Sequence, residues 1–229
     1  MIYVTGDTHG GIDIAKLKSE SFPTNRQLSK DDYVVVAGDF GFVWDGSDKD
    51  KYWLEWFRER NFTTLFVDGN HENFDLLNRY PIDIWHGGKA HIINDSVVHL
   101  MRGQVFDLDG VKIFTFGGAK SKDIERRKEN GSWWEEEMPS EEEYEEGHKS
   151  LEKHGWTVDF IISHLCPSIA LECINTQCGI KAKQNDLNRY FDRIYERASF
   201  KHWYFGHFHA DLKLSDKLTL LFNKVEKII

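Results

Sequence analysis

The sequence predicts an α/β fold with a mixed β-sheet, and three observations lead to that class. Six short runs rich in β-branched and aromatic residues each end abruptly in Gly, Asp or His. Helical patterns lie between several of these runs, and such alternation is typical of α/β proteins. Residues 97–116 instead have the pattern of antiparallel strands joined through Asp109-Gly110, a favoured hairpin turn. The sheet is therefore expected to contain both parallel and antiparallel pairs.

Each predicted strand is a run that passes directly into polar residues. In chain order the runs and their polar ends cover residues 1–10, 33–41, 64–72, 111–119, 159–167 and 202–210. A helical pattern over 51–60 follows the second run, and another over 185–198 precedes the last. In the second helical pattern Leu187, Phe191 and Ile194 share one face, which predicts that this face is buried.

The strongly acidic segment near residue 140 also predicts a helix. Ser140 and Glu143 have the spacing of a capping box, and Gly155 is suited to end the helix. Because charge runs on helices usually face water, we interpret these glutamates as a solvated surface and not as metal ligands.

Composition limits the classes of function. The chain has 229 residues, three cysteines and a formal net charge of -9. We expect a single domain over 1–229, since this length buries a substantial core and no linker divides it. The odd cysteine count and the polar start favour a cytoplasmic protein without disulfides. No apolar run is long enough for a membrane span, and the net charge argues against broad binding of extended nucleic acid.

Candidate metal ligands follow the predicted strands. They are Asp7 and His9, Asp39, Asn70 and His71, His164, and His207 and His209. In open α/β sheets ligands bind beyond the carboxyl ends of the strands, so these side chains are expected to converge. A mixture of oxygen and imidazole ligands suits Mn, Fe or Zn, and the lack of thiolates argues against a structural zinc site.

The order of these residues resembles that of the calcineurin-like metallophosphoesterases. The matching motifs are GDTHG, AGDFG, DGNHE, ISHLCP and FGHFHAD, which extend from Asp7 to Asp211. The resemblance, closest to a small bacterial and phage-type subgroup, implies a four-layered α/β/β/α sandwich of mixed sheets with a dinuclear metal site at the strand ends. It implies one metal held by Asp7, His9 and His209, a second held by Asn70, His164 and His207, and Asp39 as the bridge.

This resemblance also implies the chemistry. Two divalent cations, Mn²⁺ in the first place with Fe, Zn or Ni as alternatives, would share a hydroxide that attacks phosphorus in line. His71 is not a ligand in the family and would protonate the leaving oxygen or stabilise phosphoryl charge. Phe42 and Val43 stand where the family's protein phosphatases have an Asp and an Arg, which argues against that activity. The group that orients His71 is left open among Asp45, Asp68 and Glu72.

A basic loop follows the fourth predicted strand. Within it Lys120 and Arg127 are predicted to contact a substrate phosphate. The alternative is a solvated loop in which Trp133 and Trp134 belong to the core.

These observations predict a phosphoesterase acting on a phosphomonoester or phosphodiester of a small or nucleotide-derived substrate. Two alternatives come from other classes, namely a nuclease subunit and a scaffold that retains the fold without catalysis. The expected partner is a small phosphorylated or nucleotide substrate, with no membrane. The natural substrate, the preference for monoester or diester, the metal and the oligomeric state are left open.

Overall fold

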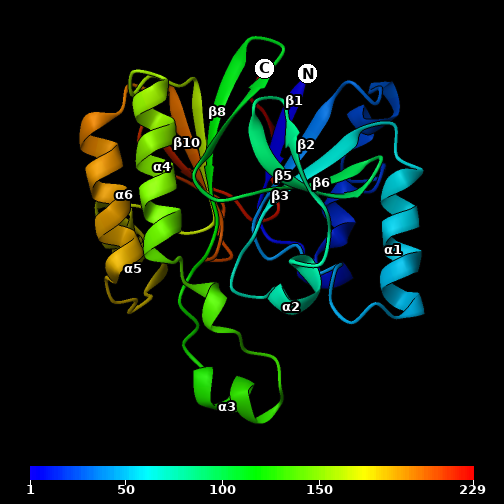
Figure 1. The fold of residues 1–229 in the computed structure, drawn as a ribbon, viewed down its shortest axis with the longest axis horizontal. Helices are drawn as coiled ribbons and strands as arrows, with labels where there is room; N and C mark the ends of the chain where they lie inside the picture. Colours follow the sequence, from blue (N-terminus) through cyan, green and yellow to red (C-terminus); the bar gives the residue numbers. More distant parts are fainter.

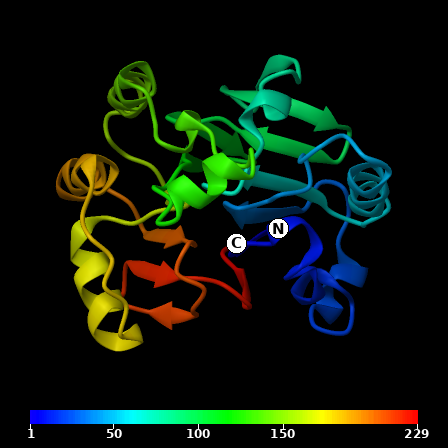
Figure 2. The same cartoon turned by 90° about the horizontal axis from the view of Figure 1, so that it is seen from below.

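A computed structural model describes residues 1–229 as two β-sheets that face each other, with helices on the outer side of each sheet (Figure 1). This is the four-layered α/β/β/α arrangement of mixed sheets that the motif resemblance implied. Figure 2 shows the same layers from below, with the two sheets between the outer helices.

The first sheet has seven strands. In spatial order they are β13 (Val225–Lys227), β1 (Ile2–Thr5), β2 (Tyr33–Ala37), β3 (Thr63–Val67), β6 (Val97–Leu100), β5 (Gly88–Asn94) and β4 (Ile82–Trp85). Strands β1, β2, β3 and β6 are parallel, whereas β13, β5 and β4 pair antiparallel with their neighbours.

The second sheet has six strands. In spatial order they are β11 (Leu212–Lys213), β12 (Leu218–Leu220), β10 (His202–Phe205), β9 (Phe160–Ser163), β8 (Val111–Phe116) and β7 (Gln104–Leu108). Its four central strands are parallel, and β11 and β7 close the edges antiparallel.

Alternation along the strands builds three layers of apolar packing. In β2, Val35 belongs to the core between the two sheets, whereas Val34 and Val36 belong to the core under the outer elements of the first sheet. A third core lies between the second sheet and its helices and contains Phe191 and Trp203. Strands buried on both faces require the nearly continuous apolar runs that the sequence shows.

The helices are short and lie mostly outside the sheets. They are α1 (Asp48–Arg58), α2 (Phe74–Leu77), α3 (Ile124–Glu129), α4 (Glu141–Lys153), α5 (Ser168–Cys178) and α6 (Asp186–Arg197), with 3-10 turns at His9–Gly11, Ile14–Leu17, Pro23–Gln27 and Glu135–Glu137. Helix α1 covers the first sheet, α4, α5 and α6 cover the second, and α3 projects from the body below the strand ends (Figure 1). No helix combines the length and the apolar character needed to cross a membrane.

Most of the predicted elements are confirmed. All six predicted strands are present, and Ser140 and Glu143 form the capping box at the start of α4. The hairpin through Asp109-Gly110 is also present, with positive φ at both turn residues.

The segment 97–116 is divided between the two sheets in a way that the sequence pattern did not predict. Strand β6 does not pair with β7, because the chain crosses from the first sheet to the second between Leu100 and Gln104. In the first sheet β6 pairs parallel with β3 and antiparallel with β5.

Candidate metal centre

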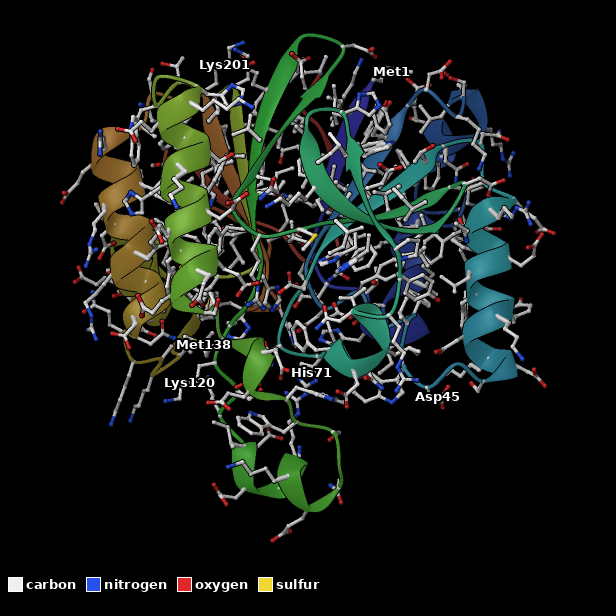
Figure 3. All side chains as sticks on the ribbon, in the orientation of Figure 1. Met1, Asp45, His71, Lys120, Met138 and Lys201 are labelled. Atoms are coloured by element: carbon white, nitrogen blue, oxygen red, sulfur yellow. The ribbon has the colours of Figure 1, made fainter.

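The parallel strands of both sheets end at the same lower edge of the molecule, where His71 and Lys120 are labelled in Figure 3. The loops after β1, β2, β3, β9 and β10 bring the predicted ligands together there. Two groups of potential ligand atoms result, each with all its atoms within 4.8 Å of one another. The first group is Asp7, His9, Asp39 and His209, and the second is Asp39, His164 and His207.

Asp39 belongs to both groups. Its Oδ2 atom lies 3.3 Å from Nε2 of His9 and 3.4 Å from Nε2 of His164. Its Oδ1 atom accepts a hydrogen bond of 2.7 Å from the backbone N–H of His71. One carboxylate oxygen is thus fixed by the backbone, and the other faces the space between the two groups.

Asp7 provides a direct test of whether the residues suit a cation. Its side chain is fully buried, and Oδ1 accepts a hydrogen bond of 3.0 Å from the backbone N–H of His207. Oδ2 has no hydrogen-bond partner and lies 3.2 Å from Nε2 of His209 without hydrogen-bond geometry. A buried carboxylate oxygen without a partner is costly, and a bound cation would satisfy it.

Hydrogen bonds at Nδ1 fix the ring orientation of His9 and His164. Nδ1 of His9 lies 2.7 Å from Oδ2 of Asp13, and Nδ1 of His164 lies 2.8 Å from the carbonyl oxygen of Ala37. In both cases Nδ1 donates a hydrogen bond to the oxygen, so that Nε2 faces the centre and is the atom that would bind a cation once it has lost its proton. Metal-binding histidines are usually oriented by this kind of contact.

Asn70 is held in the same manner. Its Nδ2 atom donates to Oγ of Ser121 at 3.0 Å, which turns Oδ1 to within 3.3 Å of Nε2 of His164. Ser121 itself donates to Oε2 of Glu137 at 2.6 Å and accepts from the guanidinium of Arg127. The amide oxygen therefore joins the second group of candidate ligands.

Backbone strain is concentrated at this centre. Four of the predicted ligands have φ in the left-handed region: His9 (44°), Asp39 (47°), His207 (74°) and His209 (49°). Such a conformation costs a non-glycine residue about 1–3 kcal/mol and persists where the surroundings enforce it. Here the four residues lie in the loops that follow β1, β2 and β10, where the candidate ligands meet.

Two glycines leave room for the ligands. A Cβ atom on Gly38 would lie 2.1 Å from Nδ1 of His164, and one on Gly69 would lie 2.0 Å from Oδ1 of Asp39. Gly38 also has a φ of +97°. Glycine is required at these positions because the backbone passes against the ligand side chains.

The carboxylates and imidazoles of the centre strongly shift one another's pKa values. Burial alone would lower the pKa of His9 and of His164, but the adjacent Asp39 carboxylate raises these values to about 9 and about 10. Burial and the neighbouring His164 lower the pKa of His207 to about 3. Without a cation, two imidazoles are thus held as charged partners of the carboxylates.

His71 lies beside the ligands without joining either group. It lines a hollow of about 280 Å³ together with Asp39, Asn70 and His207, which we call the central hollow. It also lines a neighbouring hollow of about 350 Å³ that contains Trp44. Burial lowers the pKa of the His71 imidazole; the Asp39 carboxylate opposes this shift and the Arg127 guanidinium adds to it.

None of the three acidic residues considered for orienting His71 forms a hydrogen bond with its ring. Glu72 is buried and accepts hydrogen bonds from the backbone N–H of Phe40 at 2.7 Å and of Gly41 at 3.0 Å. It therefore links the loop after β3 to the loop after β2. Asp45 accepts from the backbone N–H of Ser47 at 2.9 Å. The third, Asp68, belongs to a separate network.

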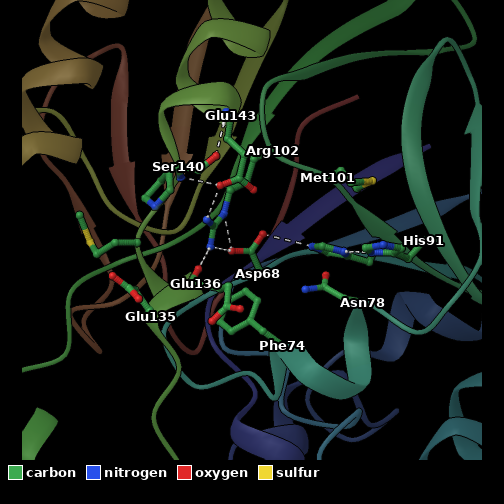
Figure 4. A pocket seen from close by; sticks show the side chains of 13 residues that line it. Asp68, Phe74, Asn78, His91, Met101, Arg102, Glu135, Glu136, Ser140 and Glu143 are labelled. Atoms are coloured by element: carbon green, nitrogen blue, oxygen red, sulfur yellow. Dashed lines mark hydrogen bonds and ion pairs between the residues drawn. The ribbon is translucent and has the colours of Figure 1, made fainter.

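That network was missed in the sequence. Nε of Arg102 donates to Oδ2 of Asp68 at 2.9 Å, Nη1 of Arg102 bonds Glu143 at 3.0 Å, and Asp68 Oδ1 lies 3.2 Å from Nε2 of His99 (Figure 4). Nδ1 of His99 lies 2.9 Å from Nδ1 of His91. Both histidines are buried and belong to this polar chain.

The two predicted substrate contacts differ in their surroundings. Lys120 is exposed and lines the central hollow. Arg127 is only 4% exposed, and its guanidinium bonds Ser121 and the carbonyl oxygen of Ser132. Arg127 supports the Asn70 side chain through Ser121, and its contact with substrate stays a prediction.

Trp133 and Trp134 are partly exposed and lie outside the three apolar cores. Nε1 of Trp134 donates to Oδ2 of Asp75 at 2.9 Å, and its ring meets Trp44 edge to face. The alternative of a core tryptophan pair is therefore wrong.

A four-layered sandwich whose strand ends carry two adjoining groups of candidate metal ligands defines a class of metal-binding α/β proteins. The family model of the calcineurin-like phosphoesterases matches residues 1–211, and the chain belongs to this family. The family comprises metal-dependent phosphoesterases and is typically dinuclear. No curated protein matches the chain.

Proposed function

We propose that this protein hydrolyses a phosphomonoester or phosphodiester bond in a small or nucleotide-derived substrate, with two divalent cations at the strand ends. The observation that supports this most strongly is the position of Asp39 Oδ2, almost equally distant from His9 and His164. A carboxylate shared by two adjoining groups of ligands is what two adjacent cations require.

The donor set supports Mn²⁺ as the first candidate, with Fe, Zn or Ni as alternatives, because it combines carboxylate, amide and imidazole without thiolate. Asp7, His9 and His209 would hold one cation, and Asn70, His164 and His207 the other. The orphaned Oδ2 of Asp7 supports the first of these assignments. When bound, such a pair supplies Lewis acidity that activates water at neutral pH and neutralises charge on the phosphoryl oxygens.

The residues around this pair have distinct tasks in the proposed reaction. Asp39 and Asp7 hold negative charge that matches the cations, and Asn70 contributes a neutral oxygen. His71 donates a proton from its imidazole to the oxygen of the leaving group as the bond to phosphorus breaks, and regains one from solvent. Burial lowers the pKa of His71. The negative charge of a substrate phosphate in the central hollow would raise this pKa and so favour the protonated ring.

The test is a comparison of rates. Protein stripped with a chelator and reloaded with Mn²⁺ is assayed on para-nitrophenyl phosphate and on bis(para-nitrophenyl) phosphate. Hydrolysis of the diester supports a phosphodiesterase, and hydrolysis of the monoester supports a phosphatase. If the protein with metal bound hydrolyses neither, the proposal fails for these substrate classes and the scaffold alternative gains support.

A further inference from the structure

A cluster of four lysines lies beside the candidate metal centre. Lys120 and Lys122 come from the loop after β8, and Lys181 and Lys183 come from the connection between α5 and α6. All four line one hollow of about 440 Å³, which we call the lysine hollow. The sequence separates the two pairs by about sixty residues, so only the fold reveals the cluster.

The four ammonium groups have no acidic partner. The lysines of this chain that form ion pairs are others, namely Lys51, Lys89, Lys149, Lys201 and Lys213. Two carboxylates line the central hollow: Asp39 belongs to both groups of candidate metal ligands, and Asp123 is paired with Arg126. Four uncompensated positive charges around one hollow repel each other, and in a chain of net charge -9 they form a local site for an anion.

The connection that carries Lys181 and Lys183 is anchored. Between them, Ala182 donates its N–H to Oδ1 of Asn175 at 3.0 Å and accepts from Nδ2 of Asn175 at 2.9 Å. Gln184 bonds Oγ of Ser168 at the start of α5. An anchored backbone lowers the entropy cost of placing both ammonium groups around a ligand.

The lysine hollow adjoins the metal centre. Four residues line both the lysine hollow and the central hollow, namely Lys120, Lys122, His207 and Phe208. One small molecule can therefore reach both. A phosphate at the candidate metal ligands and a second phosphate among the lysines would belong to the same substrate.

We propose that the lysine hollow binds a second phosphate group of the substrate, so that the substrate class is a small ester with at least two phosphates. This inference rests on the proposed function for the position of the reacting phosphate. Lysine ammonium groups bind phosphate as point charges, so the contribution of this subsite falls as ionic strength rises.

The test compares adenosine 3′,5′-bisphosphate with adenosine 5′-monophosphate, which differ by one phosphate. Both are measured as inhibitors of para-nitrophenyl ester hydrolysis by the Mn²⁺-loaded protein. The test variant is Lys181→Gln/Lys183→Gln. The control is Lys18→Gln/Lys153→Gln, which removes the same charge from exposed lysines outside both hollows.

We expect the wild type to bind the bisphosphate about tenfold more tightly than the monophosphate, and the test variant to lose most of this ratio. The control variant should keep the wild-type ratio. Equal affinity of the wild type for the two ligands would overturn the inference, and so would an equal loss in both variants.

If the protein hydrolyses neither para-nitrophenyl ester, the proposed function fails for those substrate classes, but the same ratios are then measured by calorimetry. A high wild-type ratio that the test variant loses and the control keeps would still support the subsite. Any other set of ratios would overturn it.

Discussion

Nδ1 of His9 lies 2.7 Å from Oδ2 of Asp13, the residue that directly precedes the 3-10 turn at Ile14–Leu17. Asp13 thus fixes the ring of a candidate ligand without facing the centre itself. Contacts of this kind typically change metal affinity by about 10–100-fold when removed. We expect Asp13→Asn to weaken binding of one Mn²⁺ by that factor, measured by competition with a fluorescent chelator.

The matched control for this change is Asp48→Asn. Asp48 is fully exposed on α1 and pairs only with Lys51, so its replacement alters net charge equally and should leave metal affinity unchanged. Similar affinities for Asp13→Asn and wild type would show that Asp13 does not position His9.

His71 and Asp39 are expected to differ in their effects. His71→Ala should reduce turnover by about 10²–10⁴-fold while metal remains bound, because the ring supplies a proton but no ligand. Asp39→Ala should lose metal and activity together, because Oδ2 serves both ligand groups. The measurement is metal content and kcat for each purified variant, and equal metal loss in the two would contradict the assigned roles.

Gly38→Ala should displace His164. The added Cβ would lie 2.1 Å from Nδ1 of that ring, in a backbone conformation with φ of +97°. We expect lower stability and loss of metal at the second group. Gly46→Ala is the control, since Gly46 has a φ of +69° but no atom within 4 Å of the added carbon. Its cost should be limited to about 1 kcal/mol of backbone strain, with metal retained. Both are checked by urea unfolding and metal analysis.

The buried ion pair between Arg102 and Asp68 should matter for folding. Both side chains are almost fully buried, at 3% and 2% exposed. Arg102→Met leaves the carboxylate of Asp68 uncompensated, and we expect a loss of about 3–5 kcal/mol in the free energy of unfolding. Arg58→Met, which breaks an exposed pair with Asp95, should cost less than about 1 kcal/mol. A small effect of Arg102→Met in urea unfolding would contradict this account.

Metal binding should release protons. Asp39 holds the pKa of His9 at about 9 and that of His164 at about 10, so both rings are charged at neutral pH without metal. A cation binds only the neutral ring, and affinity should therefore fall as pH decreases through about 10 and then about 9. Calorimetry at pH 7.5 in buffers of different ionisation enthalpy should detect release of about two protons per chain. Binding without proton release would refute the assigned charge states.

The sequence predicted the strands and their polar ends well because both signals are local. Runs such as 33–37 are buried on both faces, and the ligands follow them directly. The crossing between β6 and β7 was not predictable, because a short Gly-containing connection fits a hairpin as well as a change of sheet. Pairing partners depend on the whole fold.

The residues that orient the candidate ligands were not predicted, for a similar reason. Asp13 looks like an ordinary residue beside a turn, and Ser121 acts on Asn70 across fifty residues of chain. Lys181 and Lys183 lie in an irregular connection whose path depends on the packing of α5 and α6. Motif spacing identifies the candidate ligands, whereas tertiary structure selects the groups that orient them.

The central claim is that Asp39 joins two cations in one phosphoesterase centre, and a Mn²⁺ titration tests it most directly. Stripped protein receives increasing equivalents of Mn²⁺ while hydrolysis of the para-nitrophenyl esters and the electron paramagnetic resonance spectrum are followed. Activity that rises until two equivalents are bound, with the spectrum of a spin-coupled pair, is the predicted result. Full activity at one equivalent with only an isolated Mn²⁺ signal would contradict it.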